Sequence, residues 1–508
     1  MKNIIKFAFL TILTGSLSLT GCDIFDNQKD KIDKAEISYT YNDYLHYNFH
    51  DLDGTPLKGS PKLLVVPVWF TDSRTYIPVA SKEKVRTDIQ KAYFGSDDEV
   101  GWKSVKTYYE ELSGGKLSLT GVVTPWYECG RASSYYYSDL SGQSATNALV
   151  TSAVDWYKQQ NRRTDMKDFD SDHNGYIDGV MLIYGSPDYG ALHNNNAPNM
   201  WAYCYWLQGK NKDTSNPKPN AFFWASYDFM YGSNTSPSNY HSGDTLHCKI
   251  DTHTYIHEMG HMFGLEDYYD YSGQCMPAGG YSMQDLNVGS HDPYSVMALG
   301  WANVYVPTKS CKLELNNFQS SHDVIMLTNH FNNSPFDEYF LLELYTPTGL
   351  NEFDNTYQYS GKYPTGPSYA GIRLWHVDAR LLSVDKGTGT ITNYASRVTP
   401  DSSYVHAMSN TYYKANHTSE SYISPLGKDY ANYNILQLIR NNKNATYRQN
   451  TLISNSDLFH SGDSFRISTF GKQFVKENRM NDNGRDSWSF TVTSLSSDKA
   501  VISITRVS

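Results

Sequence analysis

The pattern of apolar and polar residues differs between the N-terminal and C-terminal parts of the chain. Residues 63–70 form an almost unbroken apolar run, whose length and content predict a buried strand. Pro67 lies inside this run and cannot donate a ladder hydrogen bond, so it predicts an edge position or a bulge. A further strand is expected around residues 117–123, and the apolar run at residues 180–184 predicts another.

Helical spacing occurs between these strands. One helix is predicted by four apolar residues on a single face, namely Val105, Tyr108, Tyr109 and Leu112. Ser104 can cap this helix, and Gly114 with Gly115 can end it. Residues 145–159 predict a second helix. Residues 186–248 are rich in Asn, Ser, Pro and Gly, and therefore predict long loops.

After about residue 311 the helical periodicity nearly vanishes. Short alternating runs, which indicate half-buried strands, occupy residues 338–345, 371–377, 434–439, 464–467, 488–493 and 500–505. They predict an antiparallel β domain of the sandwich type, with residues 346–370 and 380–430 as long loops. The chain as a whole is therefore expected to be α+β.

The N-terminus has the pattern of an export signal. Lys2 and Lys6 precede an apolar stretch over residues 7–19, and Leu19-Thr20-Gly21-Cys22 follows at once. This ending resembles the lipobox of bacterial lipoproteins, which implies cleavage before Cys22 and lipidation of its thiol. A soluble secreted protein or an uncleaved anchor are the alternatives. No later stretch reaches the roughly 18 apolar residues that a spanning helix needs.

Composition narrows the class of protein. Apolar residues make up 39% and charged residues 19%, which indicates folded domains instead of disorder. The net charge is −10 and the chain has no Lys/Arg cluster, so we expect no nucleic-acid partner. An odd number of cysteines remains after Cys22, so at least one thiol stays free; they are Cys129, Cys204, Cys248, Cys275 and Cys311.

The segment His257-Glu258-Met259-Gly260-His261 has the spacing of a metal site. His257 and His261 lie four positions apart, so both imidazoles leave one face of a helix and can reach one zinc ion. Glu258 is then placed as the general base for a water molecule at the metal. The alternative is an ordinary amphipathic helix with two exposed histidines.

A third ligand follows the helix. Gly264 can end the helix in the left-handed conformation and return the chain, so that Asp267 reaches the metal. Glu266 and Asp270 remain alternative ligands. Farther along, Met283 follows two glycines and fits the methionine-bearing turn that lies beneath the zinc ion in metzincins, unless it is a surface-loop methionine.

A second cluster of oxygen ligands predicts a calcium site. Asp170, Asp172, Asn174 and Asp178 stand at loop positions one, three, five and nine, and the carbonyl of Tyr176 can serve position seven. Hard oxygen ligands suit calcium better than zinc. The loop is not a full EF-hand, because position twelve lacks a bidentate Glu; the alternative is a solvated acidic turn.

These motifs resemble the M6 family of bacterial metalloproteases, the immune-inhibitor-A-like peptidases. The matching segments are residues 63–72, 104–109, 115–117, 170–184, 257–268, Met283, 292–295, 298–301, 338–343 and 375–378. The resemblance implies a metzincin-like catalytic domain, a catalytic zinc ion, structural calcium and extracellular proteolysis. It also implies His257, His261 and Asp267 as ligands and Glu258 as base. Residues 23–60 are shorter than a large inhibitory pro-domain.

The expected organisation is a signal peptide at residues 1–21, a tether at 22–60, a zinc-protease domain at 61–310 and a β-rich domain at 311–508. The expected function is that of a zinc endopeptidase with protein or peptide substrates. Cys22 would hold it in the lipid bilayer, at the extracellular face of a bacterial membrane, unless it is released.

The rival function is an inert surface lipoprotein that binds glycans with its aromatic-rich C-terminal half. The intact Glu258 and the full ligand set argue against inertness, although glycan targeting could accompany proteolysis. His376 and Asp378 share one face of a predicted strand, where we expect a hydrogen-bonded polar pair in preference to a second metal site.

Overall fold

The computed structural model describes residues 54–507 apart from 208–211, 232–248, 331–333, 357–364, 385–390, 395–402, 407–409, 411–432, 483 and 485–486. Cys22 and Cys248, with the predicted signal peptide, lie outside the described residues. Within the described part, none of the helices has the length and apolar character needed to cross a bilayer.

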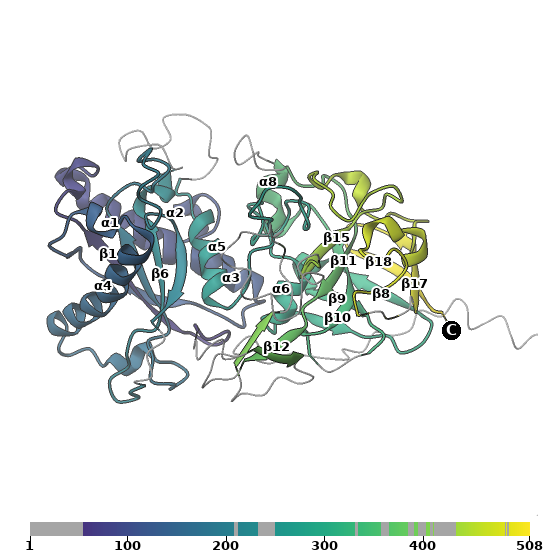
Figure 1. The fold of residues 1–508 in the computed structure, drawn as a ribbon, viewed down its shortest axis with the longest axis horizontal. Helices are drawn as coiled ribbons and strands as arrows, with labels where there is room; N and C mark the ends of the chain where they lie inside the picture. Colours follow the sequence, from purple (N-terminus) through teal and green to yellow (C-terminus); the bar gives the residue numbers. More distant parts are fainter. Residues whose placement is uncertain are drawn as a thin grey trace, which may run out of the picture.

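The N-terminal half is built on one mostly parallel sheet (Figure 1). Its strand order is β2-β1-β4-β6-β5, with β3 continuing the line of β2, and only β5 runs antiparallel to its neighbour. The strands are β1 (Lys62–Trp69), β2 (Thr120–Val123), β3 (Tyr127–Glu128), β4 (Val180–Tyr184), β5 (Tyr203–Trp206) and β6 (Ala221–Ser226). The predicted apolar runs at residues 63–70 and 180–184 thus form central strands.

Helices cover both faces of this sheet. They are α1 (Lys82–Phe94), α2 (Asp97–Val100), α3 (Val105–Leu112), α4 (Asp139–Gln160) and α5 (His253–Met262), and α6 (Pro293–Ala298) follows them in the chain. Along β1, Leu63 and Val65 join the core with α1, α3 and α5, whereas Leu64 and Val66 join the core with α4. A strand that is buried on both faces reads as a continuous apolar run, which explains its sequence.

The expectation that Pro67 marks an edge strand is wrong, because β1 is an inner strand of the sheet. The Leu64 amide donates toward the β4 side, at 2.9 Å, so the alternation along the strand directs the Pro67 nitrogen to the opposite side. On that side β2 pairs only as far as Val65, and β3 pairs only from Val68. Pro67 therefore falls in a gap between two short partners, where no amide donor is needed.

Residues 186–248 do not consist of loops alone, contrary to expectation. They contain β5 and β6, and all six residues of β6 are buried. The run Ala221-Phe222-Phe223-Trp224 was the signal for this strand, but the abundant Asn, Pro and Ser residues around it masked that signal. The predicted helix at residues 104–112 does form, with Ser104 and Thr107 as a capping box.

The C-terminal half contains two sheets that enclose a second core. One sheet has the order β15-β11-β10-β9-β7, and the other has the order β16-β17-β18-β8. Their strands are β7 (Asn303–Tyr305), β8 (Cys311–Asn316), β9 (Asp323–Leu327), β10 (Glu338–Tyr345), β11 (Gly371–Asp378), β15 (Leu436–Ile439), β16 (Ser464–Arg466), β17 (Trp488–Leu495) and β18 (Lys499–Arg506). Each of the six predicted alternating runs overlaps one of these strands.

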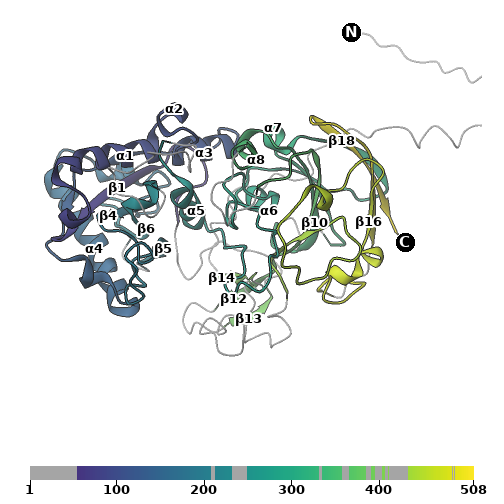
Figure 2. The ribbon, with the colours of Figure 1, turned by 90° about the horizontal axis from the view of Figure 1, so that it is seen from above.

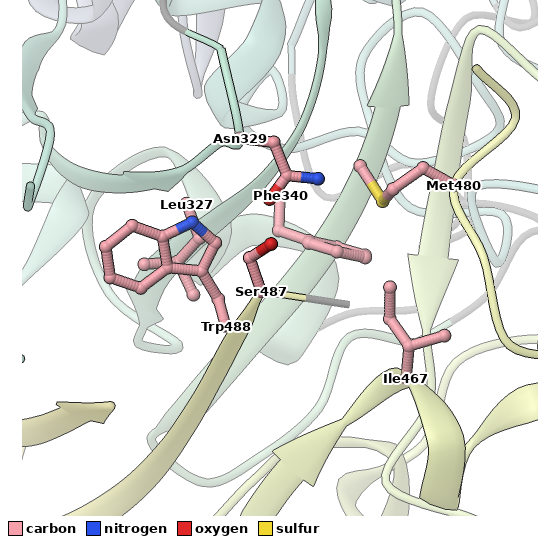
Figure 3. Close-up of a pocket in the computed structure, with 7 residues that line it drawn as sticks. All are labelled: Leu327, Asn329, Phe340, Ile467, Met480, Ser487 and Trp488. Carbon is pink, nitrogen blue, oxygen red and sulfur yellow. The ribbon is translucent and has the colours of Figure 1, made fainter. Parts of the chain in front are cut away.

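Residues 380–430 also depart from the expected long loop. They include a small antiparallel sheet of β12 (Leu381–Val384), β13 (Ile391–Tyr394) and β14 (Ser403–His406). Two short helices complete this half, α7 (Phe318–Ser321) and α8 (Glu352–Thr356). A small cavity in the second core is lined by seven residues with no titratable side chain (Figure 3), so it offers no acid, base or metal ligand.

The largest core is shared by both halves of the chain. Figure 2 shows α5 and α6 between the first sheet and the β-rich region. Tyr281 and Met283 belong to the same buried cluster as Leu341 of β10 and Trp375 of β11. The segment after α5 is therefore packed on one side by the N-terminal half and on the other by the C-terminal sheet.

Candidate metal centre

Helix α5 carries three of the predicted site residues. The helix starts at His253, whose amide donates to Asp251 Oδ1 at 3.0 Å. Gly260 is required by packing, because a Cβ atom there would lie 2.3 Å from Gln284 Oε1. The helix is thus pressed against the segment that contains Met283, and His257 leaves it toward that segment.

The chain returns to the helix at Asp267. Gly264 has φ +95°, a left-handed conformation that few other residues adopt. His257 Nε2 and His261 Nε2 lie 3.0 and 3.3 Å from Asp267 Oδ1, and 3.2 Å from each other. Ligands at 2.0–2.1 Å from a tetrahedral zinc ion lie about 3.3 Å apart, so the three atoms have the spacing of a zinc site.

Backbone carbonyls fix both imidazoles in this orientation. His257 Nδ1 lies 2.8 Å from the carbonyl oxygen of Met283, and His261 Nδ1 lies 2.8 Å from that of Leu265. Each Nδ1–H can donate to its carbonyl, which leaves Nε2 free to bind a metal ion. Met283 therefore acts here through its backbone, while its side chain is fully buried.

The donor set fits a zinc ion. Asp267 Oδ1 and Glu258 Oε2 are buried without a hydrogen-bond partner, although buried carboxylate oxygens are normally paired. Two imidazoles and one carboxylate are the kinds of ligand found at catalytic zinc, which has three protein ligands and keeps its fourth position for water or substrate. Glu266 is exposed and Asp270 accepts hydrogen bonds from loop residues 272–275, so neither alternative carboxylate joins the cluster.

Glu258 has the electrostatics of a base. Only 6% of its surface is exposed. Burial raises the pKa of Glu258 above its ordinary value, and the neighbouring imidazoles only partly offset this effect. Burial also acts on Asp267, but the two imidazoles outweigh it and hold the pKa of that carboxyl well below its usual range. The two carboxyl groups are therefore suited to different tasks, one to take up a proton and the other to stay ionised.

Two tyrosines complete the surroundings, and sequence reasoning did not single them out. The Tyr271 hydroxyl donates to Asp267 Oδ2, although the residue is 58% exposed. The ring of Tyr269 stacks on His257, with centroids 6.4 Å apart. Their proximity to Asp267 in the sequence was the only signal that could have selected them from the many tyrosines of the chain.

Strand β5 passes beside Glu258. It contacts α5, and it is the edge strand of the first sheet among the described residues. Cys204 lies on this strand, and its pKa is raised first by burial and then by the charge of Glu258. The edge of the sheet is therefore next to the candidate metal centre.

The structure brings together three of the five predicted calcium ligands. Carboxylate oxygens of Asp170, Asp172 and Asp178 all lie within 4.8 Å of one another. The Asn174 side-chain oxygen instead accepts the Tyr176 amide at 2.8 Å. Burial raises the pKa of Asp178 to about 7. The three carboxylates form a partly buried acidic cluster.

Gly175 shapes this loop. Its φ is +87°, and a Cβ atom there would lie 2.7 Å from the Asp213 amide nitrogen. Its own amide donates to Asp170 Oδ2 at 3.0 Å. The sharp turn predicted at loop position six is therefore present.

His376 and Asp378 have partners within the C-terminal half. His376 Nε2 lies 2.8 Å from Glu338 Oε1. Asp378 accepts two hydrogen bonds from Arg380, at 2.7 and 2.8 Å, and one from Asn481 at 2.9 Å. They are hydrogen-bonded polar residues in the β-rich region. The four described cysteines are free thiols, so the described part of the chain has no disulfide.

Comparison with known protein families gives a match that covers this part of the chain. Residues 75–291 match the family model described as Immune inhibitor A peptidase M6, catalytic domain. No curated protein matches the chain. The matched segment contains α5, Asp267 and Met283, and it ends before β10. Residues 75–291 are therefore similar to the catalytic domain of the M6 metallopeptidases, the immune-inhibitor-A-like family.

Proposed function

We propose that this metallopeptidase is a zinc endopeptidase. His257, His261 and Asp267 would hold the metal, and Glu258 is the general base. The observation that carries the proposal is the convergence of three ligand atoms at 3.0–3.3 Å beside a buried carboxylate oxygen without a partner. This arrangement combines a metal site with a positioned base, which peptide hydrolysis requires.

Different residues of the chain have different roles in the proposed hydrolysis. When bound, zinc supplies a Lewis acid that acidifies water and polarises the peptide carbonyl. Glu258 takes a proton from the attacking water and passes it to the leaving amine, so the carboxylate is regenerated after each cycle. Asp267 stays ionised, and the carbonyls of Met283 and Leu265 keep the two imidazoles oriented.

Peptide substrates can be held in extended form. Strand β5 pairs with β6 along one edge, and no strand among the described residues pairs with its other edge. A free edge of this kind can pair with an extended peptide through backbone hydrogen bonds. Because β5 lies beside Glu258, a peptide on this edge would present its backbone to the base.

The cellular setting is a separate part of the proposal. We place the enzyme outside the cell and attach it to the membrane through a lipid on Cys22, as the sequence predicts. Mass spectrometry of the N-terminal peptide tests this, because an unmodified Cys22 would contradict it. Accessory glycan targeting by the β-rich region also rests on sequence alone, and Tyr369 is the large exposed aromatic residue described there.

Removal of the metal should abolish activity. Phenanthroline prefers transition metals to calcium, so with calcium held in excess it should reduce casein hydrolysis to background. Added zinc should restore hydrolysis, whereas added calcium should not. Hydrolysis that continues after zinc has been removed, as verified by elemental analysis, would refute the zinc mechanism.

We also propose that Asp170, Asp172 and Asp178 bind a structural calcium ion. Affinity near ~10⁻⁴–10⁻³ M is typical of extracellular sites. Calcium at a hundredfold excess over its Kd should stabilise the folded state by about 2.7 kcal/mol, provided that it binds only that state. Melting temperature should therefore rise with added calcium, measured with zinc held constant.

The double variant Asp170→Ala with Asp172→Ala should lose this increment and keep its zinc. Asp168→Ala is the matched control, because Asp168 is acidic and exposed but lies outside the cluster. If the double variant responded to calcium as the wild type does, the calcium-site proposal would be refuted and the loop would be an acidic turn.

A further inference from the structure

The turn that supports His257 is held by residues outside the matched segment. Tyr281, two residues before Met283, is fully buried, and its hydroxyl donates to Asp354 Oδ1 at 2.9 Å. Asp354 lies on α8, in the C-terminal half. This hydrogen bond spans 73 residues of sequence, so it ties the turn to a distant part of the chain.

A buried cation and a close backbone fix the position of the Tyr281 ring. Arg373 on β11 is fully buried, and its Nε lies 2.7 Å from Glu343 Oε1 on β10. The guanidinium carbon is 5.3 Å from the centroid of the Tyr281 ring. Gly366 lies so close that a Cβ atom there would be 2.3 Å from the Tyr281 hydroxyl. The hydroxyl therefore has little freedom to move away from Asp354.

A second attachment holds the far end of the same segment. The Ser290 amide donates to Asn351 Oδ1 at 3.1 Å, and the Ser290 carbonyl accepts the Met283 amide at 3.2 Å. Met283 then presents its carbonyl to His257 Nδ1 at 2.8 Å. The chain of contacts thus runs without a gap from the C-terminal half to a predicted metal ligand.

We propose that Tyr281 and Asp354 are positioning residues for the zinc site. Their hydrogen bond holds the Met283 carbonyl where it orients the His257 imidazole. The inference rests on the proposed zinc function and extends it, because it makes the metal affinity of the M6-like segment depend on the β-rich region. Groups that orient a ligating histidine typically change metal affinity by about 10–100-fold when removed.

The sharpest variant is Tyr281→Phe, which deletes one hydroxyl and keeps the ring in the core. We expect the zinc Kd, measured by competition with a chelator, to rise about tenfold. We also expect kcat to fall at saturating zinc while KM stays close to that of the wild type, because the substrate edge at β5 is untouched.

Tyr339→Phe is the matched control. Tyr339 lies in the same core, and its buried hydroxyl donates to the Pro335 carbonyl at 2.6 Å instead of to the turn. Both variants lose a buried hydroxyl and its hydrogen bond to an oxygen acceptor, so both should lower the melting temperature; Tyr281→Phe also loses the 3.3 Å contact with the Tyr345 hydroxyl. Only Tyr281→Phe should weaken zinc binding. Equal zinc affinity in the two variants would overturn the positioning role.

Asp354→Asn is a conservative variant that tests rescue of zinc binding, because its amide oxygen can still accept the hydrogen bond from the Tyr281 hydroxyl. It should bind zinc almost as the wild type does, whereas Asp354→Ala should resemble Tyr281→Phe. A wild-type chain that binds no zinc would refute the proposed function itself. A wild-type chain that binds zinc, with Tyr281→Phe unchanged in affinity and kcat, would refute only the positioning role.

Discussion

Replacement of Glu258 by alanine should abolish proteolysis and leave zinc in place. Glu258 lies next to the metal cluster in sequence but supplies no atom to it. A positioned base typically accounts for about 10²–10⁴-fold of the rate, so kcat should fall by that factor. The measurement pairs casein hydrolysis with zinc content by elemental analysis.

Glu258→Gln refines the test, because glutamine keeps the size of the side chain and loses the ability to take up a proton. It should be as inactive as Glu258→Ala, which would separate lost basicity from lost packing. Full activity in either variant would contradict the assigned role of Glu258. Loss of zinc in both would instead make Glu258 part of the metal site.

Asp267→Ala should lose both zinc and activity. The variant removes the carboxylate that lies 3.0 and 3.3 Å from the two Nε2 atoms. Loss of a group that merely orients a ligand costs about 10–100-fold in metal affinity, so loss of the ligand itself should cost more than ~100-fold. Zinc affinity and casein hydrolysis should be measured on the same preparation.

Asp270→Asn is the control for Asp267. It changes a nearby carboxylate whose oxygens accept hydrogen bonds from the amides of Ser272 and Gln274. This variant should keep its zinc, because Asp270 supplies no atom to the metal cluster. If Asp267→Ala kept normal zinc content while Asp270→Asn lost it, the third ligand would have to be reassigned.

The site was predictable where its chemistry is local in sequence. His257 and His261 are related by one helical turn, and Gly264 allows the return to Asp267 within six residues. The same holds for Asp170, Asp172 and Asp178, which a single loop brings together around Gly175. Spacing rules apply in such cases because backbone geometry alone fixes the distances.

Other parts could not be predicted because they depend on tertiary contacts. The inner position of Pro67 depends on a gap between β2 and β3, two segments more than fifty residues away. The β6 strand was hidden by its polar surroundings. The Tyr281–Asp354 contact joins two residues with no shared motif, so only the packed structure identifies it.

If Tyr281 and Asp354 position the zinc site as proposed, the attachment of the Met283 turn to Asp354 and Arg373 also implies an order of events during synthesis. The ribosome makes His257, His261 and Asp267 well before it makes Asp354 and Arg373, which hold the Met283 turn in place. We expect arrested chains that end before Asp354 to bind zinc weakly and to leave casein intact. A producing cell would then be spared digestion by the unfinished enzyme, since competence for catalysis comes only after the C-terminal sheet has formed.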